Sequence, residues 1–338
     1  MSTILAADIG GTKTHFVITD NTGKNVLYNR IYLSSDYATF SQLLHTVLHT
    51  SGAAGKQVEI FSLAIAGDVE TTTVKVTNLP WRINRQALME EFKLRQVYVM
   101  NDFQASAWGI ACLEDTDKIC LHKGKELASG TRVVLGAGTG MGLAWVQQLA
   151  GNREVFSTEA GHIDFAPVNA LQVKLLQYLM VCYQHVSCER LLSGAGLETI
   201  YQFLSEKYTD VSALQNKAQT ETVASAKPGD FNAAWVTSQA VAGNETACRA
   251  VRLFTEIYGA YIGNMALIFK PAGGIYITGG IAAKIQPWMQ SQAFISAFKA
   301  KGRMQNLVEA ISITLVTNES VGVLGAISAA TEFYQEKV

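Results

Sequence analysis

The feature that most constrains this chain is a strand pattern that occurs twice, each time broken by a short glycine-rich turn. Residues 4–9 and 14–19 have the apolar character of strands and flank Gly10-Gly11-Thr12-Lys13. Residues 132–135 and 142–147 have the same character around Gly136-Ala137-Gly138-Thr139-Gly140. We therefore expect a fold whose two halves each begin with an antiparallel hairpin built on a glycine turn.

Each hairpin is followed by a similar order of elements. The first half continues with a strand, a helix, a strand, a helix, a strand and a helix that begins at Asp102. The corresponding ranges are 26–33, 37–49, 59–65, 85–92 and 97–100. This order predicts an α/β protein with a βββαβαβα core in each half.

The second half contains more helix than the first. After a strand at 154–157 comes an all-helical tract over 171–269, inside which the polar stretch 217–230 predicts an exposed loop. A strand at 274–278, a helix after Gly279-Gly280, a strand at 311–316 and a closing helix at 320–334 complete the chain. We interpret the tract as a helical insertion in the larger of two domains.

Composition excludes several classes of protein. The 338 residues suffice for about two domains, and 27 basic against 28 acidic residues provide no general attraction to nucleic acid or to an anionic membrane. The longest apolar stretch, residues 257–269, is too short to span a bilayer and predicts a buried core helix. The five cysteines form no C-x-x-C pair, which disfavours zinc or a disulfide framework, and the N-terminus lacks the pattern of a secretory signal. We expect a cytoplasmic protein with reduced thiols.

The two glycine turns are candidates for phosphate binding. A glycine turn lets backbone N–H groups approach a phosphate closely, and a threonine hydroxyl adds a donor. A single turn of this kind is equally typical of an ordinary hairpin. Neither turn fits the dinucleotide fingerprint or the P-loop. Two turns, one in each half, favour a nucleotide held between the domains.

Two aspartates lie where strands end. Asp8 ends a buried strand, where its carboxylate needs either a cation such as phosphate-bound Mg²⁺ or the N–H groups of the adjacent turn. Asp102 follows Asn101 between a strand and a helix, so it serves either as an N-cap or as a base that accepts the proton of an attacking hydroxyl. The residues alone leave both pairs of alternatives open.

A third group combines carboxylates with an imidazole. Glu159-Ala160-Gly161-His162 and Cys188-Glu189-Arg190 have few ion-pair partners nearby in the sequence. Their spacing matches no standard metal pattern, and hydrogen bonds to a polyol suit these side chains as well as a metal does. A purely structural role for His162 is the remaining alternative.

These segments together resemble the bacterial glucokinases of the hexokinase and actin-like ATPase superfamily, and the resemblance extends over nearly the whole chain. Asp8 to Thr12 and Gly136 to Gly142 look like the two phosphate motifs, and Thr77-Asn78-Leu79-Pro80-Trp81 like the segment leading to the sugar site. Three further segments look like the catalytic segment, the sugar loop and the adenosine motif: Asn101 to Ala105, Glu159 to Pro167 and Ile277 to Ile281.

The resemblance implies a two-domain, ribonuclease H-like fold and ATP-dependent phosphorylation of the 6-hydroxyl of glucose. Asp102 is then the general base, and the sugar hydroxyls bind Asn101, Glu159, His162 and Glu189. The ATP-binding residues it implies are Asp8 (near Mg²⁺, through water), Gly10, Gly11, Thr12, Gly138, Thr139, Gly279 and Gly280. It also implies a homodimer.

The chain departs from the family pattern at a few positions. Lys13 stands where many relatives have asparagine, Ala137 replaces a frequent proline, and Ser157-Thr158 replace glycines. The chain lacks the C-x-C-G-x-x-G-C zinc cluster of related sugar kinases and repressors, so we expect no zinc. We expect residues 1–112 with about 320–338 to form the small domain and 113–319 the large one. A kinase of another hexose or amino sugar, or a non-catalytic sugar sensor, remains an alternative.

Overall fold

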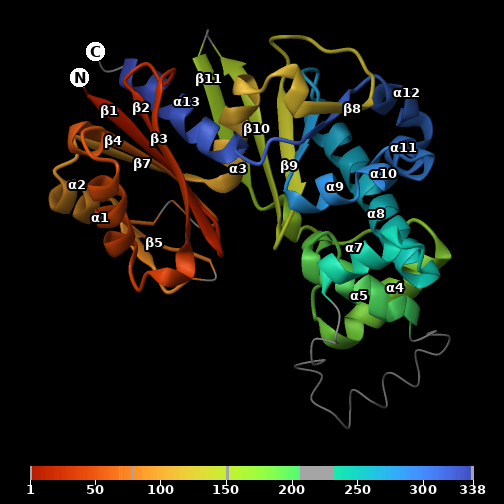
Figure 1. Cartoon of the computed structure of the whole chain (residues 1–338). Helices are drawn as coiled ribbons and strands as arrows, with labels where there is room; N and C mark the ends of the chain where they lie inside the picture. The colour runs from red at the N-terminus through yellow and green to blue at the C-terminus, as the bar shows by residue number, and fades with distance from the viewer. Residues whose placement is uncertain are drawn as a thin grey trace.

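The computed structural model describes residues 2–67, 69, 71–77, 79–149, 152–205 and 232–335. The expected loop at 217–230 and Asn78 of the segment leading to the sugar site lie outside these residues. The elements that follow the N-terminus lie together on the left of Figure 1, and the later strands with most of the helices lie on the right.

Five strands form the first sheet: β1 (Thr3–Ile9), β2 (Lys13–Asp20), β3 (Val26–Leu33), β4 (Val58–Ile65) and β7 (Gln96–Asn101). Their order is β3-β2-β1-β4-β7. The β3–β2 and β2–β1 pairs are antiparallel, whereas the β1–β4 and β4–β7 pairs are parallel. The central strand β1 therefore ends at the edge where the parallel strands also end, and it carries Asp8 there.

Four helices cover this sheet: α1 (Phe40–Thr50), α2 (Arg85–Phe92), α3 (Asp102–Gly109) and α13 (Val321–Gln335). Apolar side chains of α1 and α2 pack with Leu5 and Phe16 on one face. Those of α13 pack with Ala6 and Val17 on the other face, where α3 packs beside it against Met100. The C-terminal helix thus lies on the N-terminal sheet, as Figure 1 shows.

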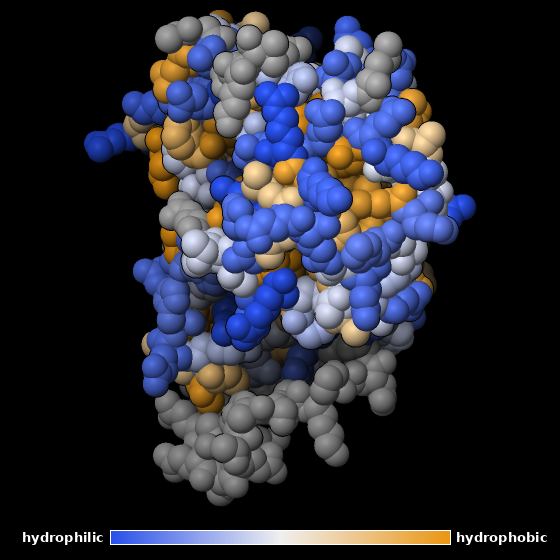
Figure 2. All heavy atoms as spheres, turned by 90° about the vertical axis from the view of Figure 1, so that its left-hand side faces the viewer, coloured by the Kyte–Doolittle hydropathy of each residue, from blue (hydrophilic) through white to orange (hydrophobic). Residues whose placement is uncertain are grey.

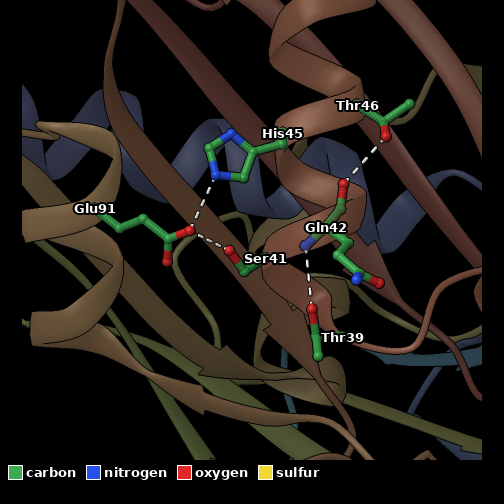
Figure 3. A network of polar contacts seen from close by, with 6 residues as sticks. All are labelled: Thr39, Ser41, Gln42, His45, Thr46 and Glu91. Atoms are coloured by element: carbon green, nitrogen blue, oxygen red, sulfur yellow. Dashed lines mark hydrogen bonds and ion pairs between the residues drawn. The ribbon is translucent and has the colours of Figure 1, made fainter.

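Helix α1 begins later than its apolar spacing predicts, at Phe40 instead of residue 37. The side-chain oxygen of Thr39 accepts a hydrogen bond from the N–H of Gln42 at 3.2 Å, which makes Thr39 the N-cap. On the same helix, Nε2 of His45 lies 3.0 Å from Oε1 of Glu91 in α2, and Ser41 donates to the same oxygen (Figure 3). These polar contacts join the two helices at the solvent side of the apolar layer.

Six strands form the second sheet: β8 (Lys118–His122), β9 (Arg132–Ala137), β10 (Met141–Leu149), β11 (Asn152–Thr158), β12 (Ile275–Thr278) and β13 (Ile313–Val316). Their order is β11-β10-β9-β12-β13-β8. From β11 to β13 the pairing is antiparallel twice and then parallel twice, the same succession as from β3 to β7. Strand β8, which the sequence patterns did not predict, pairs antiparallel with β13 at the edge.

The expected helical tract contains α4 (Ala170–Cys182), α5 (Gly194–Ser205), α7 (Ala233–Val241) and α8 (Glu245–Phe269). The apolar stretch 257–269 falls in α8, where Ile257, Tyr258 and Ile262 are buried, so the prediction of a core helix is confirmed. Among the residues that the structure describes, no helix combines the length and the apolar character that a membrane span requires.

Several short elements were not predicted. Strands β5 (Thr73–Lys75) and β6 (Arg82–Asn84) form a small hairpin that buries one apolar side chain each, Val74 and Ile83, too few to make a periodic pattern. Helix α9 (Gly280–Lys284) lies where the sequence predicts a helix after Gly279-Gly280, whereas α10 (Gln286–Met289), α11 (Gln292–Lys299) and α12 (Gln305–Glu309) were not predicted. Within the described ranges, short 3-10 turns occur between the helices and strands: η1 (Ser34–Asp36), η2 (Gly55–Gln57), η3 (Ile110–Cys112), η4 (Asp115–Asp117), η5 (Ala160–His162), η6 (Cys188–Arg190) and η7 (Gly302–Met304).

The surface of the N-terminal half is mostly polar. Figure 2 shows this side of the molecule as mainly hydrophilic, with hydrophobic areas scattered between polar side chains. Some of the exposed apolar residues belong to the edge strand β3, such as Val26 and Ile31. Scattered exposed apolar side chains of this kind are normal for a globular protein.

Candidate functional site

A cleft of about 790 Å³ lies where the ends of strands from both sheets meet. Its lining comes from β1, from the start of α3, from the β9–β10 turn, and from segments that precede α9 and α13. The lining includes most of the residues predicted as functional: Asp8, Asn101, Asp102, Gly138, Thr139, Glu159, His162, Glu189, Gly279 and Gly280. Segments far apart in the sequence are therefore brought to one place.

The other three predicted residues, Gly10, Gly11 and Thr12, form the β1–β2 turn and do not belong to this lining. The N–H of Gly10 donates to the carbonyl oxygen of Lys13 at 2.9 Å, which closes the turn. A Cβ atom added to Gly10 would stand 2.9 Å from the same oxygen, so the closeness of the turn accounts for the glycine on hairpin grounds. Phosphate binding by this turn stays a prediction.

Asn101 and Asp102 lie at the junction of β7 and α3. The side chain of Asn101 accepts from the N–H of Phe103 at 2.9 Å, and the side chain of Gln104 accepts from the N–H of Asn101 at 3.0 Å. This reciprocal pair makes Asn101 the N-cap, so the alternative role of Asp102 as the N-cap is wrong. Asp102 is the first helical residue.

The Asp102 carboxylate is partly buried, and one of its oxygens accepts from the N–H of Phe103 at 3.0 Å. Burial raises the pKa of Asp102, and the charge of Glu159 raises it further, while the backbone N–H bonds oppose the shift. A raised pKa makes this carboxylate a stronger proton acceptor than an ordinary aspartate. Its position and its basicity both suit a general base.

Asp8 has an environment that suits a cation. Burial and the charge of Asp102 raise its pKa to about 6. In the described part of the chain, no hydrogen bond from the β1–β2 turn reaches its carboxylate, so the alternative of an aspartate satisfied by turn N–H groups is not supported. A partly buried carboxylate beside a second carboxylate fits a divalent cation, because a cation offsets both charges.

The second glycine turn joins β9 to β10. The N–H of Gly138 donates to the carbonyl of Gly140 at 2.8 Å, and the N–H of Gly194 at the start of α5 donates to the carbonyl of Gly138 at 2.9 Å. Gly279 lies beside this turn with a φ of 87°, and a Cβ atom there would lie 2.6 Å from the carbonyl oxygen of Ala137. Both the left-handed backbone and the close approach require glycine at this position.

Glu159 precedes the short turn η5, His162 is its last residue, and both are exposed to solvent. Their Oε2 and Nε2 atoms are 3.8 Å apart, and the His162 side chain is 58% exposed. This exposure does not favour a purely structural role for His162, and sugar binding by this side chain stays a prediction. Beneath the turn, the hydroxyl of Tyr261 in α8 donates to the carbonyl of Ala160 at 3.1 Å and supports the backbone between the two side chains.

Glu189 reaches the cleft from η6. Its Oε2 atom accepts from the N–H of Met141, the first residue of β10, at 2.9 Å. The residue predicted to bind sugar is thus bonded to the turn predicted to bind phosphate. Within the described ranges, no three histidine, cysteine or acidic side chains are placed to bind a metal ion together.

Sequence reasoning missed part of the lining. Ser106 lies one turn into α3, and Thr317, Asn318 and Glu319 connect β13 to α13. This connection follows the carboxyl end of the parallel strand β13, and ligands of α/β proteins bind at the carboxyl ends of parallel strands. The same rule singled out Asp102, so it could have found this connection as well. Ser106 has no signal of its own in the sequence.

The chain is similar to known proteins along nearly its whole length. A family model described as glucokinase matches residues 5–333. A glucokinase of Nostoc punctiforme is 35% identical over 336 residues, covering 96% of this chain and 98% of that protein. The crystal structure of a glucokinase from an Antarctic psychrotroph has a TM-score of 0.80 at 28% identity and covers 98% of this chain and 99% of that one.

A more distant structure shares the fold alone. It is a ROK family glucokinase from Streptomyces griseus in complex with glucose and AMPPNP, with a TM-score of 0.61 at 18% identity, covering 98% of this chain and 100% of that one. Together, these likenesses confirm the α/β fold that the sequence resemblance implied.

Proposed function

The chain belongs to the glucokinase family, and we propose that it transfers the γ-phosphoryl group of ATP to the 6-hydroxyl of D-glucose. The observation that carries this proposal is the convergence of Asn101, Asp102, Glu159, His162 and Glu189 with the Gly138–Thr139 turn in one cleft. The first group offers acceptors and donors for sugar hydroxyls, and the turn offers N–H groups for phosphates.

In the proposed reaction Asp102 accepts the proton of the 6-hydroxyl as that oxygen attacks the γ-phosphorus. The bond from the γ-phosphorus to the bridging oxygen breaks, and ADP leaves. Asn101, Glu159, His162 and Glu189 hold the other hydroxyls so that the 6-hydroxyl points at the phosphate. Phosphoryl transfer depends mainly on such positioning and on stabilising the phosphate charge.

Mg²⁺ bound to ATP would supply that charge stabilisation. Asp8, whose carboxylate lies near that of Asp102, would hold the ion through water. We propose that Mg²⁺ is required and that zinc is not. Removal of metals by a chelator should abolish turnover, and added Mg²⁺ alone should restore it. Restoration by Zn²⁺ alone would contradict this assignment.

The proposed activity is tested by measuring ADP release with ATP, Mg²⁺ and a panel of glucose, mannose, fructose and glucosamine. We expect glucose to give the highest kcat/KM. A different preferred sugar would indicate a kinase of another hexose, and sugar binding without ADP release would indicate a sensor. The relatives, which are named as glucokinases, do not favour either alternative.

We also propose that the small domain consists of residues 1–112 with about 320–338, and the large domain of 113–319. The packing of α13 on the first sheet supports this division. The family resemblance alone supports a cytoplasmic homodimer. Sedimentation equilibrium at micromolar concentration should give twice the mass of the chain, and the mass of a monomer would contradict the dimer.

A further inference from the structure

Glu189 contacts the phosphate turn at two successive residues. Its Oε2 atom accepts from the N–H of Met141 at 2.9 Å, and a Cβ atom added to Gly140 would stand 2.6 Å from the same oxygen. The carboxylate therefore lies directly on the end of the turn. The contact joins residues 48 positions apart in the sequence, so it is a tertiary contact that fixes the turn relative to η6.

Met141 is also in contact with the segment that carries the other sugar residues. A Cβ atom added to Gly161, which lies between Glu159 and His162, would stand 2.0 Å from the carbonyl oxygen of Met141. Met141 is 5% exposed and is packed in the core of the larger sheet. Its peptide groups thus lie between Glu189 on one side and the sugar loop on the other.

Two backbone hydrogen bonds complete the connection. The N–H of Cys188 donates to the carbonyl of Ile163, within the sugar loop, at 2.8 Å. The N–H of Gly194 donates to the carbonyl of Gly138 at 2.9 Å, at the start of the phosphate turn. The segment from 188 to 194 is therefore bonded to both elements, and Glu189 supplies its side-chain contact.

We propose that Glu189 is a positioning residue that couples sugar binding to nucleotide binding through the 138–141 turn. The inference rests on the proposed function, which places a sugar hydroxyl on this carboxylate. A hydroxyl on one carboxylate oxygen fixes the orientation of the group, and the other oxygen then holds the N–H of Met141. The turn is thereby held in one arrangement in which it presents its N–H groups to the phosphates.

Coupling of this kind is a measurable free energy. If glucose orders the turn, nucleotide binding no longer carries the conformational-entropy cost of ordering it. Each ligand must then raise the affinity of the other by the same factor. In the wild-type protein, glucose should lower the Kd of AMPPNP by at least about 5-fold, the low end of typical couplings. AMPPNP is the probe because it resists transfer of its terminal phosphate to the sugar.

The critical variant is Glu189→Asp, which keeps the charge but shortens the side chain by one methylene and so removes the hydrogen bond to Met141. Calorimetry measures the coupling factor, which is the Kd of AMPPNP without glucose divided by its Kd at saturating glucose. In Glu189→Asp this factor should fall to less than about 2. The matched control is Glu159→Asp. This change shortens a carboxylate whose described contact is with His162, so glucose affinity should fall while the factor at saturation stays near that of wild type.

A second variant keeps the test decisive if Glu189→Asp no longer binds the sugar. Gly140→Ala keeps the Glu189 side chain unchanged, but its added Cβ atom displaces the Oε2 atom of Glu189 from the turn. It should also lower the factor to less than about 2 while glucose still binds. Thermal unfolding of each variant checks that the fold is retained.

If either variant still binds glucose and keeps the wild-type coupling factor, Glu189 does not have the coupling role. Closure of the two lobes around the sugar would then account for the coupling. Equal loss in Glu159→Asp would also overturn it. A wild-type protein that phosphorylates glucose but shows no coupling contradicts this inference alone. A wild-type protein that releases no ADP with glucose contradicts the proposed function instead.

Discussion

The carboxylate of Asp8 lies against the first turn of α13, so that a Cβ atom placed on Gly322 would stand 2.4 Å from Asp8 Oδ2. A methyl group cannot occupy that position unless Asp8 moves. We expect Gly322→Ala to lower kcat/KM for ATP by about 10- to 100-fold, because misplacement of a catalytic group by about 1 Å has effects of that size. Steady-state kinetics at saturating glucose measure the change.

The control for this variant is Ser328→Ala, a substitution on the same helix that is not part of the cleft lining. Both changes introduce a residue with better helix propensity, so a difference between them reports the contact with Asp8 and not helix stability. A wild-type kcat/KM in Gly322→Ala would mean that Asp8 has no role in turnover or tolerates displacement.

Replacement of the proposed base tests the chemistry directly. Asp102→Asn should lower kcat by about 10²- to 10⁴-fold, the usual contribution of a positioned general base. The fold should be retained, since the amide oxygen of asparagine can still accept from the N–H of Phe103. Kinetics and circular dichroism of the same preparation separate the two effects. Near-normal turnover in the variant would make the general-base assignment wrong.

The shifted pKa of Asp8 predicts a pH dependence of stability in the absence of ligands. Its pKa rises from 3.8 to about 6 on folding, so the folded state binds the proton more tightly than the unfolded state. Stability from this group is therefore present at low pH and is lost as pH rises from about 4 through about 6. At pH 7.5, Asp8→Asn should be more stable than wild type by at most about 3 kcal/mol.

The comparison is made by urea unfolding at several pH values in the presence of a chelator, and the difference should shrink below about pH 4. Asp20→Asn provides a control of opposite sign. Hydrogen bonds from Thr22 and Asn25 lower the pKa of Asp20 to about 2, so its replacement should destabilise the protein at neutral pH. If Asp8→Asn is destabilised at neutral pH as well, the Asp8 carboxylate has a donor that offsets its burial.

Most of the fold was predictable because its elements have local signals. The buried strand ending at Asp8 and the strand before Asn101 are short apolar runs, and each is followed by a turn or capping residue that stops it. Asp8 and Asp102 each lie where such a strand ends, and both line the cleft because the parallel strands β1, β4 and β7 end at the same edge of the sheet.

Other features depend on contacts between distant segments and have no local signal. Strand β8 is only partly buried and forms because β13 offers it an edge. The contact between Glu189 and Met141 arises only after α5 and η6 pack against the second sheet. A sequence pattern reports periodicity and capping, and neither determines which carboxylate oxygen meets which N–H group.

The packing of Phe103 against Gly142 gives a last prediction, about how the base is held in place. A Cβ atom added to Gly142 would stand 2.0 Å from Cδ2 of the Phe103 ring, so β10 leaves room for a ring that follows Asp102 directly in α3. Gly142→Ala should therefore overpack this contact and destabilise the protein by about 1–3 kcal/mol. A displacement of the ring that moves the start of α3 should lower kcat as well.

A second change tests whether the ring is the cause. Phe103→Leu in the Gly142→Ala background should recover part of the lost stability, with a favourable interaction energy of at least about 0.5 kcal/mol in a double-mutant cycle measured by urea unfolding. Gly138→Ala is the control for the stability measurement alone, since a Cβ atom there meets no atom within 4 Å. Strict additivity of the two single changes would show that the ring does not hold the start of α3 against β10. Recovery of stability and kcat together would show that this contact positions the Asp102 carboxylate.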